Sequence, residues 1–488
     1  MASATFFVFF AIVLTNQQKC LVIGAGPSGL VAAHSLLKFG YDVTIIESSE
    51  KIGGMCQSIH LFNQTVDLGP HRFFSSDKII NDYFHEIIGE DFTTVNRQTR
   101  IYYKNRFFDY PLKVGNVLSN LGIFQIAGIL ISYALVRVNP PKETNTFEEW
   151  VVAKFGRKLF NIFFKTYTEK LWGIPCSKID AQWASQRIKK LSLWEAVKAA
   201  FIGNIGNKHK TLVDQFAYPV YGTGAFYKKI ENKIIELGGE IILNTKVTHL
   251  KKENNQIIGI ELSDGRELKA DYFISTMPLT HLVNNTNDVP NEILDRVNKL
   301  YFRNTTLVYC EINNLSLFTD NWIYVHSPEV QHGRITNFRN WCPSLYGESK
   351  NSILCLEYWS FDDDEFWQSS DQVIFELANK ELTKLNLLPE DSKILNNHVV
   401  RIPKCYPVYE TGYMENLQPI VDYLQGIDNL FPIGRYGSFK YNNQDHSILM
   451  GLLVAKEIAT GESQNLWDIN SDSDYQEDAE YNLSGYKN

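Results

Sequence analysis

A glycine-rich turn near the start of the sequence limits the fold more than any other feature. Four apolar residues beginning at Cys20 lead into the turn GAGPSG at 24–29, and an apolar segment follows at 30–39. A second apolar run then ends immediately before Glu47. This order predicts a strand, a tight turn, a helix and a second strand, which together form a β-α-β unit of an α/β protein.

The spacing of the glycines predicts that this unit binds a dinucleotide. Gly24 allows the tight turn, Gly26 lets a pyrophosphate approach the backbone, and Gly29 lets the helix pack closely on the strand. Ser28, in the same turn, is a further candidate contact. Glu47 ends the second strand, where its carboxylate can accept hydrogen bonds from both hydroxyls of an adenosine ribose.

A second glycine pair favours FAD over NAD as the dinucleotide. Gly53, Gly54 and Met55 follow Glu47, an extension typical of flavoproteins of the glutathione-reductase and amine-oxidase type. Such a pair lets the backbone pass under the flavin-side phosphate and the ribityl chain. We therefore expect FAD as the cofactor, with Val247 of a later strand as a further contact.

The rest of the sequence predicts that the FAD-binding domain is discontinuous. Residues 238–250 indicate a strand, 257–270 a hairpin, and 271–278 a strand that returns to the nucleotide-binding sheet. The predicted fold class is α/β, with a discontinuous Rossmann-type FAD-binding domain of the glutathione-reductase type and an α+β substrate domain. The expected order is an apolar extension (1–18), a first FAD-binding part (19–75), a mostly helical substrate domain (76–220), a second FAD-binding part (221–285), the substrate-domain sheet (286–405), a C-terminal FAD-binding part (406–461) and an acidic disordered tail (462–488).

Composition argues against several kinds of partner. The 488 residues carry a net charge of −8, and most of it comes from the tail, where Lys487 is the only basic residue. The nearly neutral remainder argues against a nucleic-acid partner. The seven cysteines include no C-x-x-C pair, so we expect neither a disulfide framework nor a metal site.

Two apolar stretches bear on localisation. Residues 5–15 have the length of a signal-peptide core, but no Lys or Arg precedes them and they are too short to span a bilayer. We expect a cytoplasmic protein, with the secretory pathway or a membrane anchor through 5–15 as the alternative. Residues 114–136 carry no charge, but polar residues and glycines interrupt them. We therefore expect a buried or cleft-covering helix pair rather than membrane contact.

Two further blocks identify the family that the sequence resembles. Residues 170–175 (KLWGIP), followed by Trp183 and Arg187, resemble the substrate-domain segment of UDP-galactopyranose mutases. More loosely, they resemble the wider flavin amine-oxidase and protoporphyrinogen-oxidase group. The block GRYGSFKYNNQDHS at 434–447 resembles the closing flavin-binding motif of the eukaryotic-type mutases. The resemblance covers about residues 19–461.

The C-terminal block also has a physical interpretation of its own. A strand ends at 431–434, and a helix at 447–459 can direct its N-terminus toward the polar edge of the flavin. Amide side chains in this block can hydrogen-bond to ribityl hydroxyls or ring carbonyls. The cofactor contacts expected from it are Gly434, Arg435, Asn443 and Gln444.

A histidine loop is part of the resemblance. His71 follows Gly69 and Pro70 and resembles the family's loop in which a histidine next to glycine lies at the flavin. The mutases usually show two glycines where this chain has Gly69 and Pro70. Because proline fixes φ and removes an amide donor, a loop that moves with the flavin redox state is in doubt here.

The resemblance further implies a diphosphate clamp. Arg187 and Arg334 match positions that grip the diphosphate of a sugar nucleotide, which suits a guanidinium that can fork onto two oxygens. Tyr406 resembles a tyrosine that also reaches these phosphates, and Tyr441 is expected beside the flavin ring. With His71, these are the expected catalytic residues.

The resemblance leaves two kinds of chemistry open. In a mutase, N5 of reduced FAD attacks the anomeric carbon and expels UDP, and the sugar recloses in the other ring size without net redox change, with NAD(P)H as a possible reductant. In an oxidase or desaturase of the amine-oxidase or protoporphyrinogen-oxidase type, oxidised FAD accepts a hydride. Arg187 and Arg334 favour the mutase and a nucleotide-sugar substrate, because an amine or a porphyrin gives two arginines nothing to bind. A flavin-bound scaffold without catalysis is the least favoured interpretation.

Overall fold

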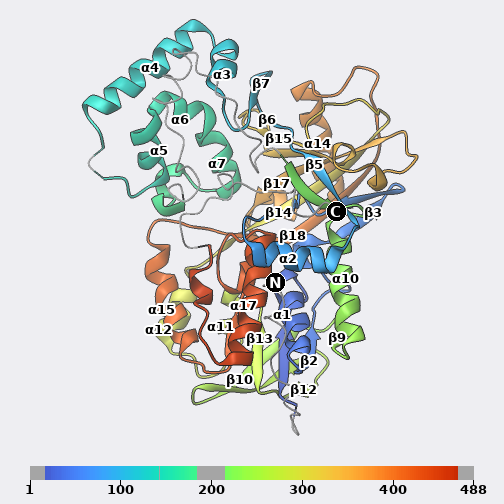
Figure 1. The fold of residues 1–488 in the computed structure, drawn as a ribbon. Coiled ribbons are helices and arrows are strands. Elements are labelled where there is room, and N and C mark those ends of the chain that lie inside the picture. The colour runs from blue at the N-terminus through green and yellow to red at the C-terminus, as the bar shows by residue number, and fades with distance from the viewer. Residues whose placement is uncertain (1–16, 142, 184–214, 471–488) are drawn as a thin grey trace, which may run out of the picture.

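The computed structural model describes residues 17–141, 143–183 and 215–470 (Figure 1). The apolar run at 5–15, Arg187 and the acidic residues beyond 470 lie outside these ranges. Within the described ranges, no helix is both long and apolar enough to cross a membrane.

A parallel sheet assembled from three distant parts of the chain forms the lower half of the molecule in Figure 1. Its strand order is β19-β13-β1-β2-β9, and all neighbouring strands run parallel. The predicted α/β fold with a discontinuous Rossmann-type domain is thereby confirmed. The strands are β1 (Lys19–Ile23), β2 (Asp42–Ile46), β9 (Glu240–Ile242), β13 (Tyr272–Ser275) and β19 (Leu430–Pro432).

Helices cover this sheet, and the central pair packs closely. Helix α1 begins at Pro27, a position where a proline's missing N–H would have no intrahelical partner. Helix α17 approaches it at Gly451, where an added Cβ would lie 2.7 Å from the carbonyl oxygen of Ser28. The helices of this part are α1 (Pro27–Lys38), α2 (Lys78–Ile88), α10 (Thr223–Glu236), α16 (Gly434–Gly437) and α17 (Gln444–Thr460).

Residues 238–250 differ from the prediction, because they form two strands rather than one. After β9 the chain turns at Asn244, whose φ is +53°, and leaves the parallel sheet. The next strand, β10 (Val247–Glu253), pairs with β11 (Gln256–Leu262), and β12 (Glu267–Leu268) completes this antiparallel sheet. The neighbouring helices are α11 (Leu279–Asn284), α12 (Asn291–Val297) and α15 (Tyr413–Gln425).

A seven-stranded sheet carries the second half of the molecule, in the order β18-β14-β17-β16-β15-β6-β7. Two of its strands come from residues 99–109, inside the segment predicted to be mostly helical, and its longest strand crosses the predicted boundary at 405. The strands are β6 (Thr99–Tyr103), β7 (Arg106–Asp109), β14 (Phe302–Ile312), β15 (Trp322–Val325), β16 (Arg334–Asn337), β17 (Ser352–Ser360) and β18 (Ile394–Pro407). Two antiparallel pairs, β3 (Ser58–Leu61) with β4 (Gln64–Asp67) and β5 (Phe92–Asn96) with β8 (Gln215–Pro219), complete the described strands.

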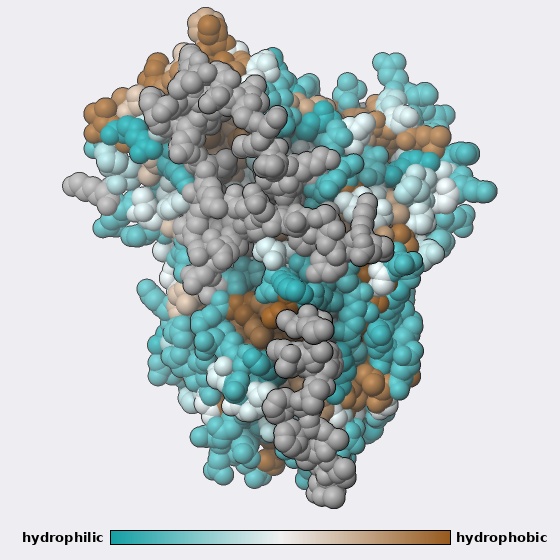
Figure 2. All heavy atoms as spheres, in the orientation of Figure 1, coloured by the Kyte–Doolittle hydropathy of each residue, from teal (hydrophilic) through white to brown (hydrophobic). Residues whose placement is uncertain are grey.

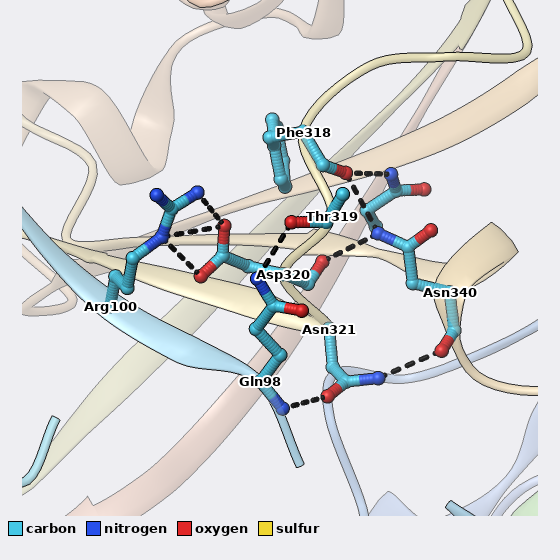
Figure 3. A network of polar contacts seen from close by, with 8 residues as sticks. Gln98, Arg100, Phe318, Thr319, Asp320, Asn321 and Asn340 are labelled. Carbon is cyan, nitrogen blue, oxygen red and sulfur yellow. Dashed lines mark hydrogen bonds and ion pairs between the residues drawn. The ribbon is translucent and has the colours of Figure 1, made fainter. Parts of the chain in front are cut away.

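A polar network fastens the two strands from residues 99–109 to this sheet (Figure 3). Nε of Arg100 on β6 donates to Asp320 at 2.9 Å, and Asp320 is fully buried. The backbone N–H of Gln98 donates to the side chain of Asn321 at 2.7 Å. These contacts hold β6 parallel to β15, across more than 200 residues of sequence.

The remaining described helices include a helical region at the top left of Figure 1. Residues 114–138 form a helix pair, as predicted, but Ile129 is the only buried residue of the longer helix. Of the two expected arrangements, the buried pair is therefore wrong, while the cleft-covering pair stays a prediction. The helices are α3 (Val114–Asn120), α4 (Ile123–Val138), α5 (Phe147–Phe155), α6 (Arg157–Phe163), α7 (Lys165–Trp172), and, beside the large sheet, α13 (Glu365–Gln368) and α14 (Asp371–Leu385).

The first residues of the predicted disordered tail are packed on the body of the protein. Leu466 is buried, and Nζ of Lys440 donates to the carbonyl of Ile469 at 3.0 Å. Asn470 donates to the carbonyl of Tyr441 at 2.9 Å. Apolar side chains at 466 and 467 explain the difference, because they can bury surface that the acidic residues further on cannot.

Candidate functional site

The glycine-rich turn is tight where the protein packs and open where a ligand would approach. A Cβ added at Gly24 would lie 2.2 Å from Oγ1 of Thr276. A Cβ added at Gly29 would lie 2.1 Å from the carbonyl oxygen of Gly24. At Gly26 an added Cβ would meet nothing within 4 Å. Gly26 precedes the first turn of α1, which has no side-chain cap. The turn therefore presents free backbone N–H groups and the positive end of a helix dipole beside open space, which suits a pyrophosphate.

Glu47 lies at the carboxyl end of β2, beside this turn. Its Oε2 accepts the backbone N–H of Ala25 at 2.7 Å, and its Oε1 accepts both the N–H and the hydroxyl of Ser49 at 2.8 Å. A carboxylate offers about four acceptor positions. The hydroxyl of Ser48 also donates to Oε1, at 3.3 Å, so all four positions are occupied. Each ribose hydroxyl therefore requires a serine hydroxyl to turn away.

The second glycine pair packs directly on the first turn. The N–H of Gly53 donates to the carbonyl of Ala25 at 2.7 Å, and an added Cβ at Gly54 would lie 3.2 Å from Cα of Gly26. Met55 follows in a short 3-10 turn and is half-buried. Val247 is buried at the start of β10, and the nearby N–H of Thr245 donates to the carbonyl of Glu47 at 2.9 Å. Residues far apart in the sequence thus surround the open space at Gly26, which we call the cradle.

The C-terminal block closes this cradle. Gly434 has a φ of +79°, and an added Cβ there would lie 2.8 Å from Oγ of Ser28. Asn443 is exposed and caps α17. The side chain of Gln444 already has partners at both ends, since it accepts the hydroxyl of Tyr227 at 2.9 Å and donates to the carbonyl of Arg72 at 3.2 Å. The amide keeps one acceptor position and one N–H that could bind a flavin.

Arg435 lies against two stacked tyrosines. The rings of Tyr406, at the end of β18, and Tyr441 have centroids 5.3 Å apart and are inclined by 20°. The guanidinium carbon of Arg435 is 4.6 Å from the first centroid and 4.4 Å from the second. Its Nε donates to the carbonyl of Cys405 at 2.7 Å and its Nη1 to that of Asn442 at 3.2 Å. These contacts fix the guanidinium and leave Nη2 without a partner among the described residues.

Arg334 is held by a carboxylate on the adjacent strand. Arg334 of β16 stands opposite Glu357 of β17 in the sheet register. Its Nε donates to Oε1 of Glu357 at 2.5 Å, and its Nη2 donates to Oε2, so the pair is bidentate. Burial disfavours the charge, but Glu357 outweighs it and raises the pKa of Arg334 well above its usual range. The remaining nitrogen, Nη1, has no partner in the part of the chain that the structure describes.

The charges of Arg334 and Arg435 both affect the pKa of Tyr406. Burial raises the pKa of Tyr406 above its usual range, Tyr441 raises it further, and the charges of Arg334 and Arg435 oppose this rise. Tyr406 therefore stays protonated at neutral pH and can donate a hydrogen bond. The indole of Trp359 meets the ring of Tyr406 at right angles, with centroids 6.3 Å apart.

His71 lies beside the ion pair in its neutral form. Burial lowers its pKa to about 4, and the charges of Arg334 and Arg435 lower it as well. Its Nε2 is 2.8 Å from the carbonyl oxygen of Leu68, which can only accept, so Nε2 carries the proton and Nδ1 is an acceptor. Its own carbonyl accepts the hydroxyl of Thr223 at 2.7 Å. The loop containing Pro70 is thus tied to α10.

The structure thus brings together four of the five expected catalytic residues, and the fifth, Arg187, lies outside the described ranges. Two members of the site were missed in the sequence. Glu357 is a single acid in the strand SILCLEYWS, and a lone charge in an apolar strand is itself a signal, because burial requires a partner. Trp359 lies on the same face, two residues on, and its buried Nε1 has no hydrogen-bond partner among the described residues.

The residues present fit a dinucleotide such as FAD. Backbone N–H groups, an acidic side chain and glycines surround open space at Gly26, and the buried hydroxyl of Ser275, at the carboxyl end of β13, has no partner in the described ranges. Among the described residues, no group of three or more His, Cys, Asp or Glu could hold a metal ion.

The sequence matches a family model and resembles several known proteins. The family model for flavin containing amine oxidoreductases matches residues 27–459. A protein named "Probable UDP-galactopyranose mutase" from Klebsiella pneumoniae is 29% identical over 174 residues, which are 34% of this chain and 44% of that protein. A 4,4'-diapophytoene desaturase of Methylomonas sp is 24% identical over 306 residues, 55% of each chain. The chain thus spans less than half of the first of these relatives and about half of the second.

Solved structures extend the comparison over the whole fold. A crystal structure of reduced UDP-galactopyranose mutase superposes with a TM-score of 0.81 at 23% identity, covering 93% of this chain and 99% of that one. A putrescine oxidase variant superposes with a TM-score of 0.64 at 15% identity, covering 91% of this chain and 99% of that one. The chain is an FAD-dependent enzyme and belongs to the family of flavin containing amine oxidoreductases.

Proposed function

We propose that this FAD-dependent enzyme interconverts the pyranose and furanose forms of a nucleotide sugar. The observation that carries the proposal is the charge of the site around Tyr406. Two half-buried guanidinium groups, of Arg334 and Arg435, lie near this tyrosine with one carboxylate, Glu357, and His71 is neutral. A site with this excess of positive charge favours an anionic substrate such as a diphosphate.

The two arginines are suited to bind phosphate oxygens without rearranging. Arg334 is anchored through Nε and Nη2, and Arg435 through Nε and Nη1. Each guanidinium therefore keeps one terminal nitrogen available, in a fixed direction, for a hydrogen bond to a phosphate oxygen. Tyr406, held protonated by burial, can donate a third hydrogen bond.

The remaining residues would orient the sugar and exclude water. Reduced FAD, when bound, would supply the nucleophile for the anomeric carbon, with NAD(P)H as a possible reductant. His71, with a bare Nδ1, can accept a hydrogen bond at the sugar or cofactor but is not an acid at neutral pH. The indole of Trp359 offers an N–H that the described residues do not use.

An oxidoreductase is the alternative function, and the charge of the site argues against an amine substrate. A protonated amine that approached the faces of Tyr406 and Tyr441 would meet the guanidinium of Arg435, which already lies there. Like charges at this distance repel. An uncharged polyene would not be repelled, but it would leave Nη1 of Arg334 and Nη2 of Arg435 without a partner.

Incubation of the chemically reduced enzyme with UDP-galactose tests the proposal. We expect UDP and UDP-sugars to bind, and a second sugar nucleotide isomer to appear by anion-exchange chromatography. The oxidised enzyme serves as the control and should produce none. Failure of UDP to bind in either redox state, together with oxygen consumption on an amino acid or polyamine, would refute the mutase and support the oxidoreductase.

A further inference from the structure

The longer helix of the pair at 114–138 presents an apolar face to solvent. In α4, Phe124 is 89% exposed, Ile123 76% and Val138 85%. Hydrophobic atoms gather over this helix at the upper left of Figure 2, at the end of the molecule farthest from the parallel sheet in Figure 1. The other exposed large apolar residues of the pair are Leu118, Leu130, Ile131 and Leu135.

The exposed residues form a stripe along one side of α4. Phe124, Ile131, Leu135 and Val138 recur at spacings of seven, four and three residues, which places them on one helical face about 20 Å long. Ile129 is buried on the other side. A helix on the surface of a globular protein normally carries polar residues on its outer face, and an apolar face of this kind marks an interaction surface.

Two basic residues flank the stripe. Lys113 precedes α3, and its Nζ lies 3.4 Å from a carboxylate oxygen of Asp109. Arg137 lies in the last turn of α4, and no acidic residue occurs in 114–141. Arg137 is exposed, and its guanidinium lies 4.9 Å from the ring centroid of Tyr133. No carboxylate pairs with Arg137 in the part of the chain that the structure describes.

We propose that the α3–α4 face lies on the surface of an anionic lipid bilayer. Anionic headgroups complement Arg137, while the apolar stripe enters the boundary between headgroups and acyl chains. A second copy of the chain fits less well, since a twofold contact would set this patch, with its exposed Arg137, against itself. Because α4 has 16 residues, it is suited to lie in the interface rather than to span the bilayer. The proposal reverses the expectation, drawn from the sequence, that the protein makes no membrane contact.

Vesicle flotation of the full-length holoenzyme tests the proposal. The probes are vesicles of phosphatidylcholine alone and of phosphatidylcholine mixed with phosphatidylserine. We expect flotation with the mixed vesicles, weaker flotation with phosphatidylcholine, and a decrease as salt is raised. The triple variant F124Q/I131Q/L135Q should float on the order of tenfold less or lower still, and R137Q should lose part of the binding to mixed vesicles only.

A matched control replaces exposed apolar residues elsewhere. Ile79 on α2 and Val373 on α14 are 59% and 53% exposed, and I79Q/V373Q should float like the unmodified enzyme. All variants should keep the flavin spectrum and thermal stability, because the replaced side chains are exposed. Two results would overturn the proposal. In the first, the triple variant floats as well as the unmodified enzyme, which would place binding in another segment such as 5–15. In the second, neither kind of vesicle binds the enzyme, and the enzyme forms a dimer in solution that the triple substitution dissociates.

Discussion

Replacing Arg334 should affect stability and substrate binding through two separable mechanisms. In R334Q, Glu357 remains buried without its charged partner, and its side chain is only 2% exposed. Removing one member of a buried ion pair costs about 3–5 kcal/mol. We expect a destabilisation of this order for R334Q and, by the same reasoning, for E357Q, in which the guanidinium is left uncompensated.

The double variant R334Q/E357Q separates the two mechanisms. A glutamine pair leaves no unpaired charge, so much of the lost stability should return. UDP binding should not return, because no guanidinium remains at this position to meet the phosphate. Loss of a buried charge contact to a ligand costs on the order of 2–5 kcal/mol, roughly thirtyfold to a few thousandfold in Kd.

The measurements are denaturant unfolding followed by flavin fluorescence and calorimetric titration of the holoenzyme with UDP. A matched control exists in the same sheet, where Arg100 pairs with the fully buried Asp320 away from the tyrosines. R100Q should lose stability and keep its UDP affinity. If R334Q/E357Q binds UDP as tightly as the unmodified enzyme, the ion pair is only structural and the proposed diphosphate site is wrong.

Four further outcomes follow from the site. Glu47→Ala should weaken FAD retention by about 1–3 kcal/mol, measured by flavin release on dilution, because a charged acceptor is lost. Gly26→Ala should leave the stability of the apoprotein unchanged and lower FAD affinity, since its Cβ meets no protein atom but faces the space for the cofactor. The pKa of His71 falls to about 4 on folding, so its contribution to the free energy of unfolding is complete above pH 6.5 and is lost as the pH falls from 6.5 toward 4. In His71→Gln, the denaturant concentration at the unfolding midpoint should therefore depend less on pH over this range. Trp359→Phe should weaken substrate binding by about tenfold or less, because its N–H has no partner among the described residues, and should lower stability because the smaller ring leaves a cavity at a buried position.

The nucleotide-binding half was predictable because its signals are local. The glycines at 24, 26 and 29 fix a turn by their own conformational freedom, and β1, α1 and β2 follow within a few residues of the prediction. The return of β13 to the same sheet also followed from a short apolar strand. The second half depends on distant pairing. The position of β6 beside β15 rests on Arg100 and Asp320, and no local pattern relates residues so far apart.

The candidate site was predictable as a set of residues but not as a set of interactions. His71, Arg334, Tyr406 and Tyr441 were expected from motifs, and the structure brings them together. The partner of Arg334 could not be predicted, because the pairing depends on the register of β16 against β17. The exposure of α4 was missed for a related reason, since an apolar helix has the same sequence pattern whether protein, lipid or water covers it.

Glu357 explains how the site can hold two guanidinium groups before any ligand binds. Burying two like charges without partners would cost several kcal/mol each. Arg334 is neutralised by Glu357, while Arg435 is stabilised by two backbone carbonyls and by the faces of two tyrosines. Neither arrangement uses all the guanidinium nitrogens. A diphosphate would therefore meet donors that are already oriented, and one of its negative charges would balance the charge of Arg435, which Glu357 leaves uncompensated.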